Sequence, residues 1–267
     1  MFGKTLPCHL GIIPDGNGRW ARENKVSIRE GHLVGAQTSE SIARNIFWRG
    51  IPYLSIWTLS EANLTDRSFL DVHNLNKIVA QKVDQMAKSL WVSEYGVRIQ
   101  IFGRWRELLC LCSEERRLIE FAEQVTRCHN RNFLNIWHIY SGSTEEIQKF
   151  EKFAKILKLH PEVEVTSRLL ESLRFGATLP PIDAILYTGL GSGESRYPER
   201  VWEQYLGRST ELLFSERLWP DFGERDLDLA LRDYASRKLA QEKRKRSRIT
   251  YRASARSFFV QFPHLHD

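Results

Sequence analysis

The sequence predicts an α/β protein in a single domain, with a mostly parallel sheet of six strands flanked by helices. Apolar runs of strand length alternate with segments in which apolar residues recur at helical spacing. Such alternation is typical of a parallel sheet that helices cover on both faces. The chain of 267 residues is also long enough to bury one sizeable hydrophobic core.

The strands and helices follow one another in order along the chain. Short apolar runs predict strands at residues 10–13, 53–59, 97–102, 133–139, 183–187 and 211–214. Helical spacing of apolar residues predicts helices at residues 33–48, 70–90, 114–128, 144–157, 166–175 and 226–243. In such sheets ligands bind outside the carboxyl ends of the strands, so a site is expected in the polar segments that follow them.

The net charge of +6 is partly local, because residues 238–248 hold six basic residues against one acid. We therefore divide the chain into a domain at 1–243 and a basic C-terminal extension at 244–267. A basic run is most often a solvated face; the alternatives are contact with an anionic membrane surface or with nucleic acid, of which nucleic acid is not expected. No apolar run reaches the roughly 18–20 residues that span a bilayer. We predict a cytoplasmic protein with, at most, a peripheral membrane contact.

The most informative pattern follows the first strand, where residues 14–20 read PDGNGRW. Gly16 and Gly18 allow the backbone to approach a ligand without a Cβ in the way, and Arg19 can hold a phosphate through two parallel hydrogen bonds. An acid fits beside a phosphate when Mg²⁺ lies between them, which makes Asp15 a candidate ligand. The pattern favours a Mg²⁺-diphosphate or triphosphate site; the alternative is a tight Asp-Gly turn with a surface arginine.

Other polar segments follow the same logic. His32 lies in REGHLVG at a predicted helix start, where it either donates to a phosphate or caps the helix. Ser60, Asn63 and Arg67 follow the second strand in LSEANLTDR, which is otherwise a polar loop. The glycine-rich segment 188–196 follows the fifth strand and is similar to a phosphate-binding loop, but it lacks the lysine of the P-loop.

Together these segments resemble the cis-prenyltransferase family of the undecaprenyl diphosphate synthase type. Residues 9–21, HLGIIPDGNGRWA, match the family's H-x-x-I-I-x-D-G-N-G-R-W-A, and residues 31–36 match its G-H-x-x-G-A. Residues 59–67 resemble its S-x-x-N-L-x-R with one residue inserted. Residues 210–237 match its closing segment, which contains L-W-P-D-F and A-L-x-D-Y. The resemblance runs in order over roughly residues 7 to 240.

The resemblance implies a Mg²⁺-dependent homodimer that condenses an allylic prenyl diphosphate with isopentenyl diphosphate, and an apolar tunnel for the prenyl chain. It implies that Asp15 holds Mg²⁺, and that Glu211 is a second Mg²⁺ ligand able to reach the partner subunit. The implied catalytic residues are Asp15, Asn17, Arg19, His32 and Asn63. The implied substrate-binding residues are Gly16, Gly18, Trp20, Arg29, Ser60, Arg67, Tyr187, Glu194, Arg196 and Arg200.

The segment after the fifth strand departs from the family. The family reads I-R-T-G-G-E-x-R-x-S there, and its two arginines and serine bind isopentenyl diphosphate. Here Tyr187 stands in place of the first arginine, about three residues are inserted, and Pro198 stands where the serine is expected. A phenol carries no charge near neutral pH. We therefore expect the second diphosphate site to be weakened, or rebuilt around Arg200 or Arg208.

The fourth strand also departs, since it carries Trp137 and His138 where the family has small residues. Trp137 is either an ordinary core residue or a side chain facing the tunnel, where it would shorten the cavity or lie beside a carbocation. Arg29 is displaced by one position from the family's arginine. These changes leave three hypotheses: cis condensation to a prenyl diphosphate of short-to-medium length; head-to-middle coupling of allylic diphosphates, or cyclisation to a terpene; and a non-catalytic partner subunit.

Overall fold

The computed structural model describes residues 5–107, 113–190 and 202–261. It confirms the α/β class and the sheet of six strands, in the order β3-β4-β2-β1-β5-β6. Neighbouring strands all pair in parallel, for example Ile12 of β1 beside Ile56 of β2. The strands are β1 His9–Ile13, β2 Tyr53–Ser60, β3 Val97–Phe102, β4 Asn132–Tyr140, β5 Ile182–Thr188 and β6 Leu206–Ser215.

The helices refine the sequence prediction at several places. They are α1 Asn17–Glu23, α2 Ile28–Trp48, α3 Asn63–Asp66, α4 Phe69–Ala87, α5 Leu90–Glu94, α6 Ser113–Thr126, α7 Gly142–Leu159, α8 Ser167–Ser172 and α9 Glu224–Gln261, with 3₁₀ turns η2 Glu203–Tyr205 and η3 Trp219–Asp221. The helix predicted at 70–90 is confirmed as α4, which ends at Ala87, and the short helix α5 that follows it was not predicted. The short helices α1 and α3 were not predicted.

The start of helix α2 is set by hydrogen bonds at its first turn. Ser27 is its N-cap, and a capping box joins the Ser27 side chain to the Glu30 backbone and the Glu30 side chain to the Ser27 backbone. Such reciprocal bonds satisfy amide groups that the first turn leaves without intrahelical partners. The helix therefore starts five residues earlier than the apolar pattern alone predicts, and its first turns extend beside α1.

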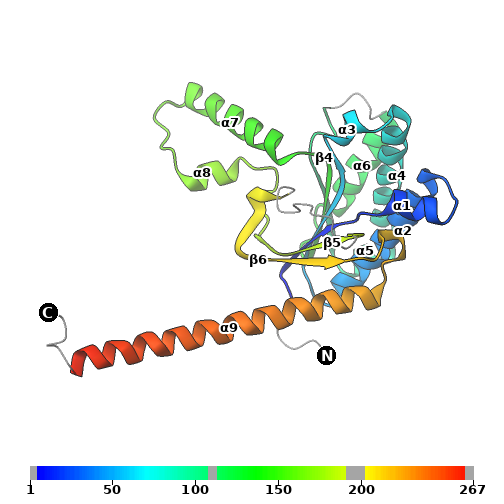
Figure 1. The fold of residues 1–267 in the computed structure, drawn as a ribbon. Helices are drawn as coiled ribbons and strands as arrows, with labels where there is room; N and C mark the ends of the chain where they lie inside the picture. The colour runs from blue at the N-terminus through cyan, green and yellow to red at the C-terminus, as the bar shows by residue number, and fades with distance from the viewer. Residues whose placement is uncertain (1–4, 108–112, 191–201, 262–267) are drawn as a thin grey trace.

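The two faces of the sheet bury different side chains. One face carries Leu10, Ile12, Leu54, Ile56 and Ile136 into the main core, which helices α2, α4 and α6 cover in Figure 1. The opposite face buries an aromatic cluster that contains Trp137, Tyr140, Tyr187, Trp202 and Tyr205. Both faces of the central strands are buried, as expected for a parallel sheet.

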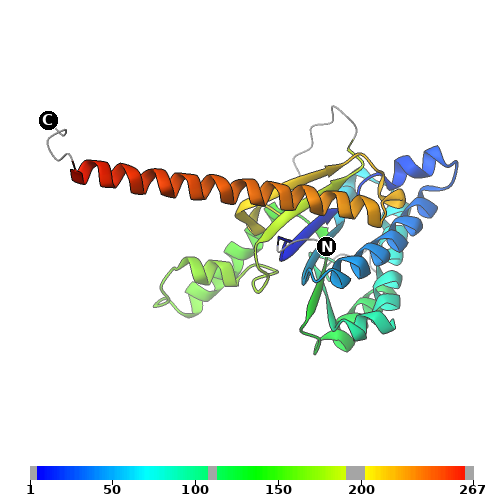
Figure 2. The same ribbon diagram turned by 90° about the horizontal axis from the view of Figure 1, so that it is seen from below.

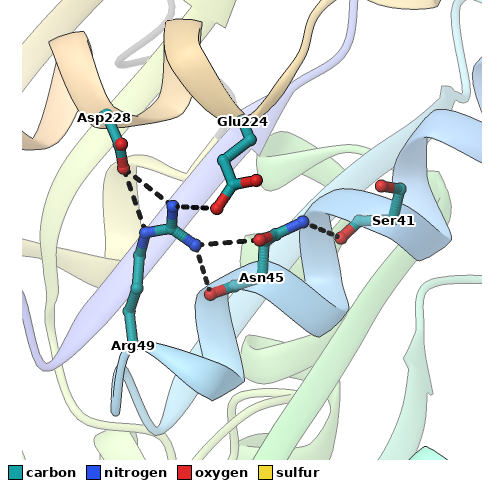
Figure 3. Close-up of polar contacts among 5 residues, drawn as sticks. All are labelled: Ser41, Asn45, Arg49, Glu224 and Asp228. Carbon is teal, nitrogen blue, oxygen red and sulfur yellow. Dashed lines mark hydrogen bonds and ion pairs between the residues drawn. The ribbon is translucent and has the colours of Figure 1, made fainter.

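Helix α9 runs beside β6 and then projects from the domain, as Figure 2 shows. It continues without a break across the predicted domain boundary at residue 243. Its first turns are held by Arg49 at the end of α2, which lies 2.7 Å from Glu224 and 2.8 Å from Asp228 (Figure 3). The Arg49 side chain is only 4% exposed, so these contacts anchor α9. Among the described helices none has the length and apolar character needed to cross a bilayer.

Candidate active site

The turn that follows β1 is fixed by the ends of two other strands. The Asp15 N–H donates to Thr188 Oγ1 at 3.1 Å, at the end of β5. The Asp15 carbonyl accepts a hydrogen bond from the Trp219 N–H at 3.0 Å, after β6. Since the carboxyl ends of parallel strands lie at one edge of the sheet, these bonds hold the PDGNGRW segment at the position predicted for a ligand site.

The two glycines of this turn serve different needs. Gly16 has a φ of 106°, and a Cβ there would lie 2.8 Å from the Leu218 side chain. Backbone conformation and close packing therefore require Gly16. A Cβ on Gly18 would meet no atom within 4 Å, and Gly18 lines a cavity. Gly18, rather than Gly16, leaves room for a ligand.

Asn17 is packed tightly against helix α2. Its Nδ2 donates to the Pro14 carbonyl at 3.1 Å, and a Cβ on Gly35 of α2 would lie only 2.0 Å from Asn17 Oδ1. Asn17 Oδ1 is buried and has no hydrogen-bond partner. A buried acceptor without a partner is costly in a folded protein, which is consistent with a position that a ligand completes.

The cavity behind this turn has a volume of about 150 Å³ and lies between the sheet and helices α2 and α4. Its polar end carries five of the residues that the sequence singled out: Asp15, Asn17, Gly18, His32 and Arg67. Its other walls are mostly apolar, with Ile56 and Ile136 from the sheet and Val83 from α4. A polar end joined to an apolar chamber fits a ligand with an anionic head and a hydrocarbon tail.

His32 and Arg67 lie together at the polar end. Arg67 Nη1 is 3.4 Å from His32 Nε2. Burial and the charge of Arg67 lower the pKa of His32 to about 4, so the imidazole is neutral near pH 7. Because a guanidinium only donates, Nε2 is the acceptor and Nδ1 carries the proton. His32 is thus prepared to donate one hydrogen bond to a ligand.

The carboxylate of Asp15 is surrounded by donors. Its Oδ1 accepts from the Gly16 N–H at 2.6 Å, and its Oδ2 lies 3.3 Å from the Tyr187 hydroxyl and 3.5 Å from Arg19 Nη2. The Asp15 side chain is 29% exposed and lines the cavity. Mg²⁺ commonly uses one or two carboxylates together with phosphate oxygens, and Asp15 offers one such carboxylate to the cavity. The residues therefore fit Mg²⁺, although no group of three or more metal-binding side chains occurs among the described residues.

Glu211 lies apart from this site within one chain. It is on β6 in register with Ala184 of β5, whereas Asp15 lies beyond the end of β1. Gln241 Nε2 donates to its Oε1, and Arg237 Nη1 is 3.6 Å from its Oε2. A metal role for Glu211 stays a prediction, and it requires a second subunit.

Several other expected site residues do not line the cavity. Ser60 and Asn63 bond each other across the end of β2, since each backbone N–H donates to the other's side-chain oxygen at 3.2 Å. Trp20 donates from Nε1 to Asp221 at 2.7 Å, which ties α1 to η3. Arg29 is exposed on the first turn of α2. Glu194, Arg196 and Arg200 lie outside the described residues.

Trp137 faces away from the cavity, so the interpretation as an ordinary core residue is confirmed and the alternative, a side chain that faces the tunnel, is wrong. It is fully buried in the aromatic cluster on the opposite face of the sheet, with ring centroids 4.8 Å from Tyr205 and 4.7 Å from Tyr140. Strand residues alternate between faces, and Ile136 takes the cavity side. His138 bonds Thr58 at 2.9 Å and Asn76 at 3.0 Å, behind the cavity wall.

Two features of this site were not predicted from the sequence. Gly35 is required for the close approach of Asn17, and Thr58 lines the cavity from β2. The G-H-x-x-G spacing places Gly35 one helical turn after Gly31, on the face that packs against α1. That spacing could have indicated a close contact between two helices.

The known proteins with similar sequences that are described here belong to one family of prenyltransferases. The prenyltransferase family model for undecaprenyl diphosphate synthase matches residues 13–242. The chain is 32% identical over 236 residues to a tritrans,polycis-undecaprenyl-diphosphate synthase (geranylgeranyl-diphosphate specific) of Pyrococcus horikoshii, covering 87% of this chain and 86% of the relative. It is 30% identical to an isoprenyl transferase of Rickettsia typhi, covering 88% and 98%.

A solved structure has a similar fold. Lavandulyl diphosphate synthase from Lavandula x intermedia, in complex with dimethylallyl diphosphate, superposes with a TM-score of 0.75 at 24% identity. The match covers 86% of this chain and 95% of that one. The likeness supports the arrangement of sheet and helices described above.

Proposed function

The chain belongs to the undecaprenyl diphosphate synthase family of cis-prenyltransferases, and we propose that it condenses an allylic prenyl diphosphate with isopentenyl diphosphate to a cis-prenyl diphosphate of short-to-medium length. The observation that carries the proposal is the cavity with a polar end at Asp15, Asn17, His32 and Arg67 and apolar walls beyond. A diphosphate bound at the polar end would direct its hydrocarbon tail into the apolar chamber.

The residues of the polar end have distinct roles in this proposal. Arg67 supplies positive charge to the allylic diphosphate, and His32 donates one neutral hydrogen bond. Arg19 does not line the cavity, but it lies 3.5 Å from Asp15 and adds positive charge beside the polar end. These groups are fixed before substrate arrives, so they can stabilise charge that develops on the departing diphosphate. Asn17 lies between the turn and α2, where its side chain orients the diphosphate. Ser60 and Asn63 hold the end of β2 near Arg67 and act as positioning residues.

Mg²⁺ is part of the proposal, with Asp15 as its protein ligand. When bound, the ion would neutralise diphosphate charge and assist departure of the leaving group. Arg19 at 3.5 Å and Tyr187 at 3.3 Å hold the Asp15 carboxylate toward the cavity. Replacing Asp15 by alanine should reduce turnover by at least about a hundredfold, while the matched variant Asp84→Ala, which loses an acid outside the cavity, should keep it.

Head-to-middle coupling of allylic diphosphates, or cyclisation to a terpene, is the second candidate. The hydrogen bond from Tyr187 to Asp15 favours it, because the residue that replaces the family's arginine is uncharged and turned toward the metal-binding acid. Charge-assisted bonds to phosphate are about twice as strong as neutral ones. A second diphosphate is therefore held differently here than in the family.

One assay separates these activities. The purified protein with Mg²⁺ receives dimethylallyl, geranyl or farnesyl diphosphate, each with and without isopentenyl diphosphate, and products are identified by mass spectrometry. Product that requires isopentenyl diphosphate supports condensation. Product from the allylic substrate alone supports coupling or cyclisation and contradicts condensation. No turnover, when binding of the allylic diphosphate is also absent, supports the non-catalytic subunit.

Two further parts of the proposal concern assembly and location. We propose a homodimer in which Glu211 reaches the partner subunit, and a peripheral membrane contact through the basic extension at 244–267. Sedimentation of the full chain tests the first, and a monomer that retains full activity would contradict it. Binding to vesicles with and without anionic lipid tests the second. A cytoplasmic location stays a prediction.

A further inference from the structure

The wall that α4 gives to the cavity contains one charged residue. Its apolar members are Leu75, Ile78, Val79, Val83 and Met86. Lys82 lies among them, one helical turn beyond Ile78 and far along the helix from the diphosphate end. Its Nζ is 3.0 Å from Oε2 of Glu40 on α2, so an ion pair crosses the seam between the two helices.

The partner of Lys82 faces a second hollow. Glu40 lines a surface groove together with Arg44, Trp48, Trp91 and Tyr95, with Gln37, Ser41 and Asn45 completing it. Trp91 of α5 donates from Nε1 to Glu40 Oε1 at 3.3 Å. Lys82, Glu40 and Trp91 therefore form a continuous partition, with the apolar cavity on one side and the open groove on the other.

The three side chains of the partition are largely buried, so packing as well as charge holds them in place. The Lys82 side chain is 16% exposed and the Glu40 side chain 31%, and Trp91 is 7% exposed with its ring stacked on Phe47. An ammonium group in a largely apolar wall is stable only when a partner neutralises it. Glu40 is that partner, and Trp91 restricts its carboxylate. The lysine chain is thereby kept stretched across the seam.

We propose that the Lys82–Glu40 ion pair closes the chain-binding cavity between α2 and α4 and so limits the length of prenyl chain that the protein accepts and makes. The inference rests on the proposed function, because it assigns the cavity to a prenyl chain. The cavity volume of about 150 Å³ is in the range that holds a ring of about six carbons. A chain of several isoprene units must therefore pass the partition or displace it.

The test uses three single substitutions. Lys82→Ala removes about four heavy atoms from the partition, close to one isoprene unit in size. Glu40→Ala removes the anchor and leaves the lysine, and because Glu40 is partly exposed this variant remains informative should Lys82→Ala fold poorly. Lys88→Ala is the matched control, since Lys88 also forms an ion pair, with Asp84 of α4 at 2.7 Å, but does not line the cavity.

Binding is measured without turnover, by calorimetry with Mg²⁺ and the thiolo-diphosphate analogues of geranyl and geranylgeranyl diphosphate. In the wild type the longer analogue should bind no more tightly than the shorter one, because its distal units meet the partition. In Lys82→Ala and Glu40→Ala the longer analogue should gain about tenfold relative to the shorter one. Lys88→Ala should match the wild type.

Products formed with isopentenyl diphosphate give the second readout. The two partition variants should shift the product distribution by one or more isoprene units, and Lys88→Ala should not. An analogue preference equal in the wild type and in whichever partition variants fold would overturn the inference, even if condensation is observed. Failure of the wild type to bind either analogue would instead overturn the proposed function, which keeps the two failures distinguishable.

Discussion

Gly35→Ala tests whether the position of Asn17 matters to the activity. The new methyl group would lie 2.0 Å from Asn17 Oδ1, whereas ordinary contacts begin at 3.4 Å. The Asn17 side chain must therefore move by about 1.4 Å, because the Gly35 backbone is fixed within α2. The Trp219 ring, 3.1 Å from the same methyl position, limits movement in the other direction.

The expected cost falls on activity rather than on stability. A misplacement of about 1 Å in a positioned group can cost on the order of a hundredfold in rate, so kcat/KM for the allylic diphosphate should fall by about that factor. Alanine favours a helix over glycine by about 1 kcal/mol. The displaced Asn17 loses its bond to Pro14, worth about 1 kcal/mol. These effects nearly cancel, and the free energy of unfolding should change by less than about 2 kcal/mol.

The assay is steady-state kinetics with the allylic diphosphate as the varied substrate, together with urea unfolding. Gly223→Ala is the control, since a Cβ there would meet only Asp226 Oδ2 at 3.9 Å; it should retain full activity. A Gly35→Ala protein that is stable and keeps kcat/KM within about threefold of the wild type would refute the role given to Asn17.

Two further predictions concern the core. Trp137→Ala should lower the free energy of unfolding by about 3–5 kcal/mol, as measured by urea unfolding. It should leave product length, measured by mass spectrometry, unchanged; longer products would show that Trp137 does line the cavity. Burial lowers the pKa of His138 to about 3 and that of His9 to about 4, below the unfolded value of about 6.5. The unfolded chain then binds more protons as the pH falls below about 6.5, so stability should drop by about 2 kcal/mol per histidine at pH 5. A urea midpoint that does not change between pH 7.5 and pH 5 would contradict this.

The sequence predicted the sheet well because its strands are short apolar runs with clear polar boundaries. It placed the end of α4 too late and did not predict α5, because neither Lys88 nor Ser89 is a glycine or proline that would mark a helix end. The full length of α9 was not predicted either, because the basic run lacks apolar residues that recur at helical spacing.

The candidate site was only partly predictable, for a physical reason. The residue types of the PDGNGRW turn are enough to predict a phosphate site. His32 lies at a predicted helix start and Arg67 follows a predicted strand, so both could be singled out from the sequence. The contact of Tyr187 with Asp15 joins residues far apart in sequence, and only the pairing of β1 with β5 brings them together. Lys82 on an amphipathic helix is typical of a solvated face, so its place in the cavity wall depends on the packing of α4 against α2.

The most direct test of cis condensation is the structure of the product formed from an allylic diphosphate and isotopically labelled isopentenyl diphosphate. We predict that label enters the product in every added unit, and that NMR shows each new double bond to be cis. Product that contains no label, or labelled product in which the new double bonds are trans, would contradict it.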